Sequence, residues 1–539
     1  MSVANSAGER DIVIIGGGHN GLVCAFYLAR AGLKVTVLER RDVVGGAAVT
    51  EEFHPGFRNS VAAYTVSLLN PKIIRDMSLA ENGLTVVERK VSNFLPVDDR
   101  QYLLVGDGRT EAEVAKFSTK DAEMLASYGQ RLDQIADVLR ELVLTVPPNV
   151  VESGWGRALP ELLKSAALGN KLSKLDIGGK RDLMALMAQS AGDYLDGWFE
   201  SAPIKAVFGF DGIVGNFASP FTPGSAYVLL HHVFGEVNGK KGAWGHALGG
   251  MGAITQAMAK AAASKGVEIK TGVAVAEVLI ESGKAVGVVT DTGETIRARA
   301  VVSNLNPKLL FGKLVDPAAQ PADFRERMQR YKCGSGTFRM NVALSELPRF
   351  TCLPDAGDHM TAGIIIAPSL DYMDQAFVDA RAQGWSKAPI VEMVIPSTLD
   401  DSLAPKGQHV ASLFCQHVQP ELSGGRSWDD HRDTVAKVMI DTVDRWAPGF
   451  KDSVLGYMAL SPLDLERKFG LVGGDIFHGQ LGLDQLFSAR PVLGHADHRM
   501  PVNGLYLCGS GAHPGGGVTG APGHNAATQI LRDFRRRMG

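Results

Sequence analysis

Three glycines near the start of the chain have the spacing of a loop that binds a pyrophosphate. Gly16, Gly18 and Gly21 form G-x-G-x-x-G directly after the apolar run Ile12 to Ile15. In such a loop the first glycine permits a tight turn, the second lets phosphate approach the backbone, and the third allows close helix–strand packing. Glu39 ends the later run "KVTVLE", where a carboxylate can accept hydrogen bonds from both ribose hydroxyls. These residues predict a dinucleotide site.

Two further glycine-rich features extend this site beyond what NAD requires. Gly45 and Gly46 follow the acidic residue and let the backbone pass close to a longer cofactor, in the position of the flavin arm of FAD. Residues 503–531, "NGLYLCGSGAHPGGGVTGAPGHNAATQIL", predict a strand, a glycine-rich loop and a helix from about His524. Such a loop can offer backbone N–H groups to the pyrophosphate or flavin and place a helix dipole near the flavin. A chain that returns to the same site from residue 500 favours FAD over NAD.

The elements that must position these residues come in three separated pieces. Between the two ends, residues 249–280 predict a helix and a strand, followed by a β-meander that ends near residues 300–307. The intervening stretches differ: one is rich in helical pattern, as in Asp121 to Val143, and the other mixes loops with strands such as Thr337 to Leu344. The simplest arrangement is an FAD-binding domain of three pieces with a substrate domain inserted twice. The expected bounds are 1–95, 241–330 and 490–539 for the first, and 96–240 and 331–489 for the second.

The composition indicates an ordinary globular protein. The 539 residues are 45% hydrophobic and 21% charged, and the net charge of −3 gives no reason to expect a nucleic-acid partner. No apolar run approaches the ~20 residues that span a bilayer, and the polar start "MSVANSAGER" lacks a signal region. The five cysteines are scattered without a Cys-x-x-Cys, which excludes a zinc knuckle and a dithiol motif. We therefore expect a cytoplasmic enzyme with at most peripheral membrane contact.

Four segments resemble the phytoene-desaturase-like FAD oxidoreductases, in particular the branch called pyridine nucleotide-disulphide oxidoreductase domain-containing protein 2. They are "DIVIIGGGHNGL", "LERRDVVGGAAVTEE", "GAWGHALGGMGAITQAMAKAA" and "GLYLCGSGAHPGGGVTGAPGHNAA". The resemblance covers nearly the whole chain. It implies an α/β fold with a glutathione-reductase-type (Rossmann-like) FAD domain and an inserted α+β substrate domain. It also implies that the backbone of Val275 contacts adenine.

The sequence departs from two related groups of enzymes. Disulphide reductases need a redox-active cysteine pair and a second G-x-G-x-x-G, whereas here Gly250-x-Gly252 lacks the third glycine. Flavin amine oxidases usually carry Arg after the double glycine, and this chain has Ala47. The Asp common in the flavin loop of other FAD folds is also missing, because Ser510 follows Gly509. These differences argue against disulphide reduction and against polyamine or monoamine oxidation.

The motifs and the resemblance together predict a set of FAD-binding residues along the two ends and the middle of the chain. The set is Gly16, Gly18, His19, Asn20, Gly21, Glu39, Arg40, Gly45, Gly46, Ala47, Ala48, Val275, Gly509, His513, Gly516, Gly517 and Val518. For His513 the favoured role is a contact that orders the flavin loop.

Catalytic candidates follow from what flavin dehydrogenation needs, which is a C–H bond held near flavin N5 and a base if the hydrogen is acidic. By resemblance, residues 473–491 lie near the flavin face, so His478 is the first candidate for acid–base work or substrate orientation. The alternative for His478 is a hydrogen bond that holds a loop. Of the adjacent His231 and His232, packing would bury one and expose the other, and His232 is a candidate that faces the substrate. Satisfied core histidines are the alternative, and two adjacent helical histidines cannot reach one metal, so we expect no metal site.

Two further side chains are weaker candidates. Arg339, in the predicted strand, could pair with a substrate carboxylate or lie on the surface of the strand as a charge. Tyr64 could line the pocket near the flavin or serve only in packing.

The leading interpretation is an FAD-dependent dehydrogenase or oxidase that desaturates a CH–CH bond. Its substrate would be small and hydrophobic, either isoprenoid-like or an alicyclic ring activated by a carbonyl group. Because no NAD domain is visible, the electrons would pass to O2 or a quinone. Two alternatives stay open: an FAD-dependent amine or alcohol oxidase, and a flavin-bound adaptor without catalysis.

Overall fold

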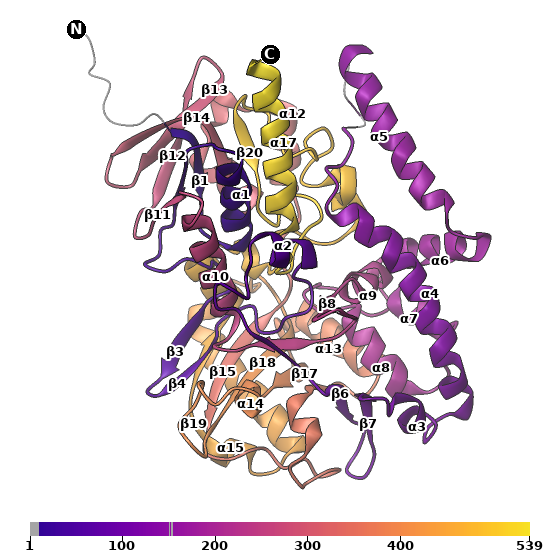
Figure 1. The fold of residues 1–539 in the computed structure, drawn as a ribbon. Helices are drawn as coiled ribbons and strands as arrows, with labels where there is room; N and C mark the ends of the chain where they lie inside the picture. Colours follow the sequence, from indigo (N-terminus) through magenta and orange to yellow (C-terminus); the bar gives the residue numbers. More distant parts are fainter. Residues whose placement is uncertain (1–9, 150, 152–154, 539) are drawn as a thin grey trace.

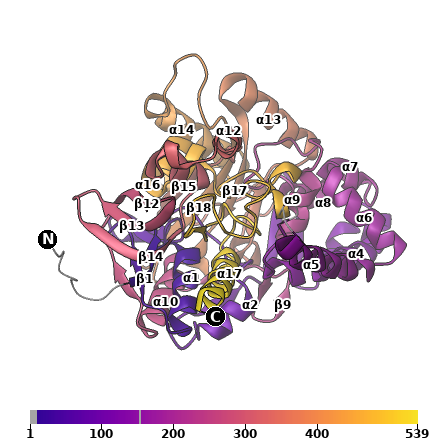
Figure 2. The same ribbon diagram turned by 90° about the horizontal axis from the view of Figure 1, so that it is seen from above.

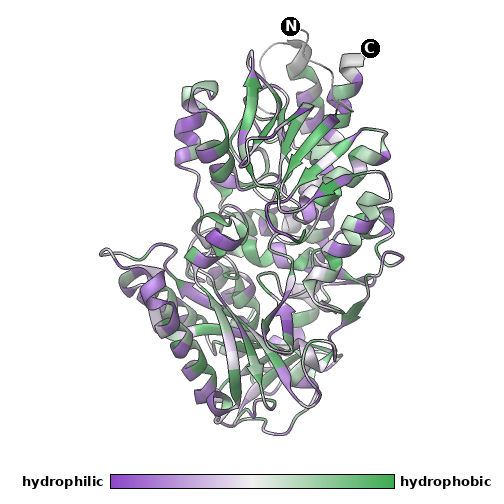
Figure 3. Cartoon of the chain, turned by 90° about the vertical axis from the view of Figure 1, so that its left-hand side faces the viewer, coloured by the Kyte–Doolittle hydropathy of each residue, from purple (hydrophilic) through white to green (hydrophobic). Residues whose placement is uncertain are grey.

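The computed structural model describes residues 10–149, 151 and 155–538, and its framework is two seven-stranded sheets (Figure 1). The first sheet has the order β11-β2-β1-β14-β13-β12, with β20 paired to β14. The second has the order β19-β15-β18-β17-β16-β6-β7. Figure 3 shows apolar residues concentrated along the strands and hydrophilic residues on the outer helices. The chain is therefore a mixed α/β protein, as the sequence predicted.

The first sheet unites both ends of the chain with its middle. Its parallel strands are β1 (Arg10–Ile15), β2 (Val35–Leu38), β11 (Glu268–Lys270), β14 (Thr295–Ser303) and β20 (Leu505–Leu507). The antiparallel strands β12 (Val275–Glu281) and β13 (Lys284–Thr290) form the predicted meander with β14. The residues of β2 are all buried, which fits the near-continuous apolar runs expected of parallel strands.

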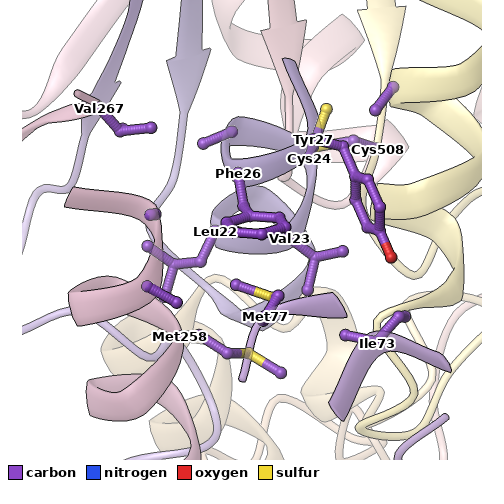
Figure 4. Close-up of a cluster of buried hydrophobic side chains, with 14 of the residues drawn as sticks. Leu22, Val23, Cys24, Phe26, Tyr27, Ile73, Met77, Met258, Val267 and Cys508 are labelled. Atoms are coloured by element: carbon purple, nitrogen blue, oxygen red, sulfur yellow. The ribbon is translucent and has the colours of Figure 1, made fainter. Parts of the chain in front are cut away.

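Three helices pack together beside this sheet: α1 (His19–Arg30), α10 (Met251–Ala263) and α17 (Ala521–Met538). Figure 4 shows Leu22 and Phe26 of α1 in the apolar core, with Met258 of α10 and Cys508 among its other members. Gly32, with a φ of +91°, follows the end of α1 as predicted. The C-terminal helix begins three residues before the expected His524.

The second sheet is antiparallel except where β6 pairs with β16. Its strands are β6 (Val91–Pro96), β7 (Tyr102–Gly106), β15 (Phe338–Leu344), β16 (Gly363–Ile366), β17 (Trp385–Val394), β18 (His409–Val418) and β19 (Val454–Leu460). Helices α13 (Leu370–Gln383) and α14 (Trp428–Trp446) pack against it. The strand predicted at Thr337 to Leu344 is confirmed as β15. The expected boundary after residue 95 would cut β6, which belongs to this sheet.

A group of helices lies to one side of the second sheet (Figure 2). It comprises α3 (Thr110–Val114), α4 (Thr119–Val143), α5 (Trp155–Ser173), α6 (Ile177–Ala188), α7 (Ala191–Asp196), α8 (Ala202–Asp211) and α9 (Ser225–Val233). In α4 the buried residues Tyr128, Leu132, Ile135 and Leu139 recur at helical spacing, and Ser118 caps its first turn. The helix predicted for Asp121 to Val143 is confirmed.

The remaining elements are short. The strand pairs are β3 (Thr50–His54) with β4 (Phe57–Ser60), β5 (Val86–Glu88) with β10 (Gly245–Ala247), and β8 (Glu236–Val237) with β9 (Lys240–Lys241). The helices are α2 (Pro71–Asp76), α11 (Pro307–Leu309), α12 (Ala322–Gln329), α15 (Phe450–Ser453) and α16 (Pro462–Phe469). Within the described ranges, every helix is too short or too polar to cross a membrane.

Candidate functional site

A cavity of about 470 Å³ is lined by residues from both sheets. This volume lies in the range of small-molecule and cofactor sites. Its walls come from residues 15–20, 38–48, 62–69, 273–275, 304–314, 468–478, 510 and 517–518, with Val214, His232, Trp244, Met251, Ile254 and Phe414. The two ends and the middle of the chain therefore meet at one site, as predicted.

The first glycine loop turns from β1 into α1 at the floor of this cavity. Gly16 has a φ of +95°, which favours glycine, and a Cβ on Gly21 would collide with the carbonyl oxygen of Gly16. A Cβ on Gly18 would lie 2.6 Å from Nδ2 of Asn304, at the end of β14. The roles predicted for Gly16 and Gly21 thus have a direct steric reason.

The double glycine pairs with this first loop. The Gly45 N–H donates to the carbonyl of Gly17 at 2.9 Å, and Gly18 and Gly45 form a parallel bridge. Gly45 has a φ of +133°, and a Cβ there would lie 2.7 Å from the carbonyl oxygen of Ala48. The two glycine segments therefore form one continuous backbone surface beneath the cavity.

Glu39 is buried at one end of the cavity. Its carboxylate accepts the Gly17 N–H at 2.8 Å and the Arg41 N–H at 2.9 Å. Each carboxylate oxygen has a second acceptor site, so two ribose hydroxyls can still be bound. The Val273 N–H donates to the Glu39 carbonyl at 2.9 Å, and this contact holds Val275 in the wall beside Glu39.

The C-terminal glycine loop closes the cavity from above α1. Gly517 and Val518 line it, and Ser510 accepts a hydrogen bond from Nδ2 of Asn20 at 3.1 Å. Gly516 and Gly509 do not line the cavity: the first lies against Phe477 and the second against the backbone of Asn304. These two glycines shape the loop through close packing.

The residues at the start of α1 fit the phosphate part of FAD. The Nε2 atom of His19 and the Oδ1 atom of Asn20 are buried, and neither has a hydrogen-bond partner among the described residues. Both residues line the cavity at the N-terminus of a 12-residue helix, where free N–H groups and the helix dipole favour an anion. A bound dinucleotide would satisfy these polar atoms.

The opposite end of the cavity is aromatic. The rings of Tyr64 and Phe414 are stacked with centroids 5.5 Å apart, and those of His232 and Trp244 are nearly parallel at 6.3 Å. Nδ1 of His232 donates to the Val228 carbonyl at 2.8 Å, and burial lowers the pKa of this histidine. Trp244 and Phe414 were not predicted from the sequence, because no motif marks them.

Tyr64 lines the cavity with its ring while its hydroxyl donates to the buried carboxylate of Glu392. Burial raises the pKa of Tyr64 well above its usual range, and the charge of Glu392 raises it further. Burial also raises the pKa of Glu392, although Tyr64, Arg89 and Arg339 oppose that rise. The phenol proton is therefore held by Glu392.

Arg339 is 1% exposed, so the expectation of a surface charge is wrong. All seven residues of β15 are buried, because this strand lies between β18 and β19. The Arg339 guanidinium lies 4.5 Å from the ring centre of Tyr64 and donates to Ser412 Oγ at 2.7 Å. It does not line the cavity, so it cannot reach a substrate carboxylate there without moving.

His478 lines the cavity, with a φ of +57° and no partner at Nδ1 among the described residues. Burial, together with the nearby His19 and Arg490, lowers the pKa of His478 to about 3. Its imidazole is therefore neutral at ordinary pH.

Arg490 holds the segment that carries His478. It is fully buried and donates to the carbonyl oxygens of Phe477, Gly479, Gln480, Gln485 and Ser510, at 2.7–3.3 Å. The segment before the C-terminal strand is thereby fastened to the glycine loop. Sequence reasoning missed this residue, since its acceptors are main-chain carbonyls that no residue type reveals.

The other histidines lie away from the main cavity. Both His231 and His232 are buried, so the expectation that one would be exposed is wrong. His231 and His513 line a second cavity of about 190 Å³, which shares Leu68 and Leu69 with the first. Nε2 of His513 donates to the Leu142 carbonyl at 3.2 Å and so ties the glycine loop to the end of α4.

Comparison with known proteins places the chain among flavin enzymes. A family model described as flavin containing amine oxidoreductase matches residues 21–337. Pyridine nucleotide-disulfide oxidoreductase domain-containing protein 2 of Rattus norvegicus is 42% identical over 98% of this chain and 94% of its own length. A limonene dehydrogenase polypeptide of Castellaniella defragrans is 26% identical over 97% and 95%. Phytoene desaturase (lycopene-forming) of Pantoea ananas is 24% identical over 97% and 99%.

Solved structures share the fold at low sequence identity. An oxidoreductase from Methanosarcina mazei superposes with a TM-score of 0.59 at 17% identity, over 97% of this chain and 100% of the other. A redesigned putrescine oxidase gives 0.57 at 16% identity, over 98% and 99%.

Proposed function

This chain belongs to the flavin-containing amine oxidoreductase family, and we propose that within it the protein converts a CH–CH bond of a small hydrophobic substrate into a double bond. The predicted resemblance is confirmed, and the protein is an FAD-dependent oxidase or dehydrogenase. Bound FAD would accept a hydride from one carbon. The neighbouring carbon loses a proton to water, and its C–H electron pair forms the new double bond. The names of two relatives, limonene dehydrogenase and phytoene desaturase, support this reaction class.

One observation carries the proposal, namely the uncharged wall at the aromatic end of the cavity. Val214, Ile476 and Phe477 complete the surface begun by the two aromatic pairs. Among the described residues that line the cavity, Glu39 is the only carboxylate, and it lies beside Val273 and Val275. A substrate ammonium group would therefore find no counter-charge at the aromatic end, whereas an isoprenoid chain or alicyclic ring would be buried by apolar contact.

The histidines of the wall suit orientation better than proton storage. A neutral imidazole carries one N–H, which can donate to the oxygen of a carbonyl-activated substrate. With a pKa of about 3, His478 is a weak base and would pass any proton on to water. We therefore assign His478 the task of holding the substrate, with His232 stacked on Trp244 as part of the opposing wall.

We also propose that the first sheet with α1, α10 and α17 is a glutathione-reductase-type FAD domain. Its three pieces are residues 1–95, 241–330 and 490–539, and the inserted substrate domain is 96–240 and 331–489. The pairing of β1 with β2, β14 and β20 supports this division, because it brings all three pieces into one sheet. We propose O2 or a quinone as the electron acceptor, and a cytoplasmic location stays a prediction.

Anaerobic reduction of the flavin tests the reaction class. The holoenzyme is mixed with cyclic ketones, isoprenoid hydrocarbons and matched primary amines, and the loss of flavin absorbance is followed. We expect the first two classes to bleach the flavin and to yield a product two hydrogens lighter. Bleaching by amines alone, with peroxide released on reoxidation, would instead establish an amine oxidase.

A variant pair connects this test to the cavity. Phe414→Ser adds a polar group to the aromatic end, whereas Phe350→Leu changes a core phenylalanine of the second sheet that does not line the cavity. We expect only the first to slow reduction by the hydrophobic substrate. Equal effects would show that the aromatic end does not hold the substrate.

A further inference from the structure

The helical hairpin formed by α5 and α6 carries large apolar side chains on its outer surface. Leu159, Leu162 and Leu163 of α5 and Ile177 and Met184 of α6 are each between 54% and 68% exposed. The pair stands away from the sheets at the side of the molecule (Figure 1). This is more exposed apolar surface than isolated surface leucines would explain.

Helix α5 is turned opposite to a normal surface helix. On its inner side Glu161 accepts the Asn149 N–H at 2.8 Å and pairs with Lys164 at 2.6 Å, and both residues are partly buried. The leucines at positions 159, 162 and 163 follow helical spacing on the outer side. A helix that buries its charged pair and exposes its leucines is built to be covered by something else.

The charges around this apolar face select the partner. Asp176 and Asp182 are neutralised by Arg131 of α4, at 3.0 and 2.9 Å. Lys180 and Arg181 are exposed between Ile177 and Met184, and neither forms a salt bridge within the part of the chain that the structure describes. Apolar side chains with unpaired basic residues beside them are the pattern of a helix that lies in the headgroup region of an anionic bilayer.

We propose that the α5–α6 hairpin docks on the surface of an anionic lipid membrane, with its leucines inserted and its basic residues at the phosphates. A second copy of the chain fits less well, because a symmetric contact would place Lys180 and Arg181 of one copy near those of the other. The proposal concerns a surface outside the cofactor cavity and does not depend on the reaction class.

Vesicle flotation of the holoenzyme tests the proposal. We expect the protein to float with vesicles of equal parts phosphatidylcholine and phosphatidylglycerol, and to bind phosphatidylcholine alone more weakly. The double variant L162E/L163E should lose binding to both. Val378→Glu is the matched control, because Val378 is 48% exposed on α13 and should leave binding unchanged.

A charge variant separates the two parts of the interaction. Lys180→Ala and Arg181→Ala should each weaken binding to the anionic vesicles about fivefold and have little effect on phosphatidylcholine. An unchanged flavin spectrum confirms that every variant is folded. The proposal is overturned if the wild-type protein does not float, or if L162E/L163E floats as well as wild type. It is equally overturned if light scattering shows that the same face holds a dimer together.

Discussion

Replacing Tyr64 with Phe separates a structural hydroxyl from a catalytic one. The change removes the O–H that Tyr64 donates to buried Glu392 and keeps the ring in the cavity wall. A hydrogen bond to a charged acceptor contributes about 1.5–3 kcal/mol. We therefore expect Tyr64→Phe to lower the free energy of unfolding by about 2 kcal/mol at neutral pH.

This loss of stability should depend on pH, because Glu392 is the acceptor. Burial raises the pKa of Glu392 in the folded protein, and the Tyr64 hydroxyl opposes the rise. Removing the hydroxyl raises that pKa further. A carboxyl whose folded pKa exceeds its unfolded pKa stabilises the fold fully below the unfolded value, and this contribution is lost as pH rises through the folded value. The variant should thus be closest to wild type at acidic pH, and the difference should grow as the pH rises.

Urea unfolding of both proteins from about pH 5 to pH 8 measures this trend. Tyr372→Phe is the matched control, because its hydroxyl donates to the neutral carbonyl of Pro389 at 3.0 Å. That loss should be about 1 kcal/mol and independent of pH. If Tyr64 were the catalytic acid or base, the rate of flavin reduction would fall by about 10²–10⁴. A rate loss of that size with a pH-independent change in stability would refute the structural role.

Three other changes address the cofactor site and the segment above it. Gly45→Ala should weaken FAD retention, measured as flavin released on dilution, because its Cβ would lie 2.7 Å from the Ala48 carbonyl; Gly283→Ala shares a positive φ but meets open space and should retain the flavin. Arg490→Lys should lower the free energy of unfolding by about 2–4 kcal/mol in urea, since one ammonium cannot serve all five carbonyls, and a smaller loss would contradict this. His478→Gln should leave the pH profile of flavin reduction flat above about pH 5, as in wild type, because the pKa of His478 is about 3; a wild-type limb near neutral pH that the variant abolishes would identify His478 as a base.

The cofactor half of the site was predictable from local sequence. Gly16, Gly21 and Gly45 meet steric demands imposed by residues nearby in the chain or by a backbone turn, and only glycine satisfies them. Glu39 ends a short buried strand, so its place at the cavity edge follows from its position in the chain. The FAD assignment, confirmed by the family, therefore rested on features whose physical causes are short-range.

The substrate half depended on contacts that no motif records. Phe414 and Trp244 enter the wall from segments 170 residues apart in the chain, and only the packing of the second sheet brings them to Tyr64. Arg339 was misplaced on the surface because a lone arginine in a strand gives no sign that strands on both sides and a tyrosine ring will enclose it. The pKa of His478 is likewise set by burial and by Arg490, and Arg490 is held by carbonyls that every residue type possesses.

The sequence by itself determined that a dinucleotide lies over Gly16 to Gly21 and reaches Gly45, because backbone conformation at glycine is a local property. Only the tertiary structure decided which side chains face that cofactor and in what charge state. Burial, desolvation and the proximity of charges are sums over residues distant in the chain, and they exist only once the two sheets have packed together.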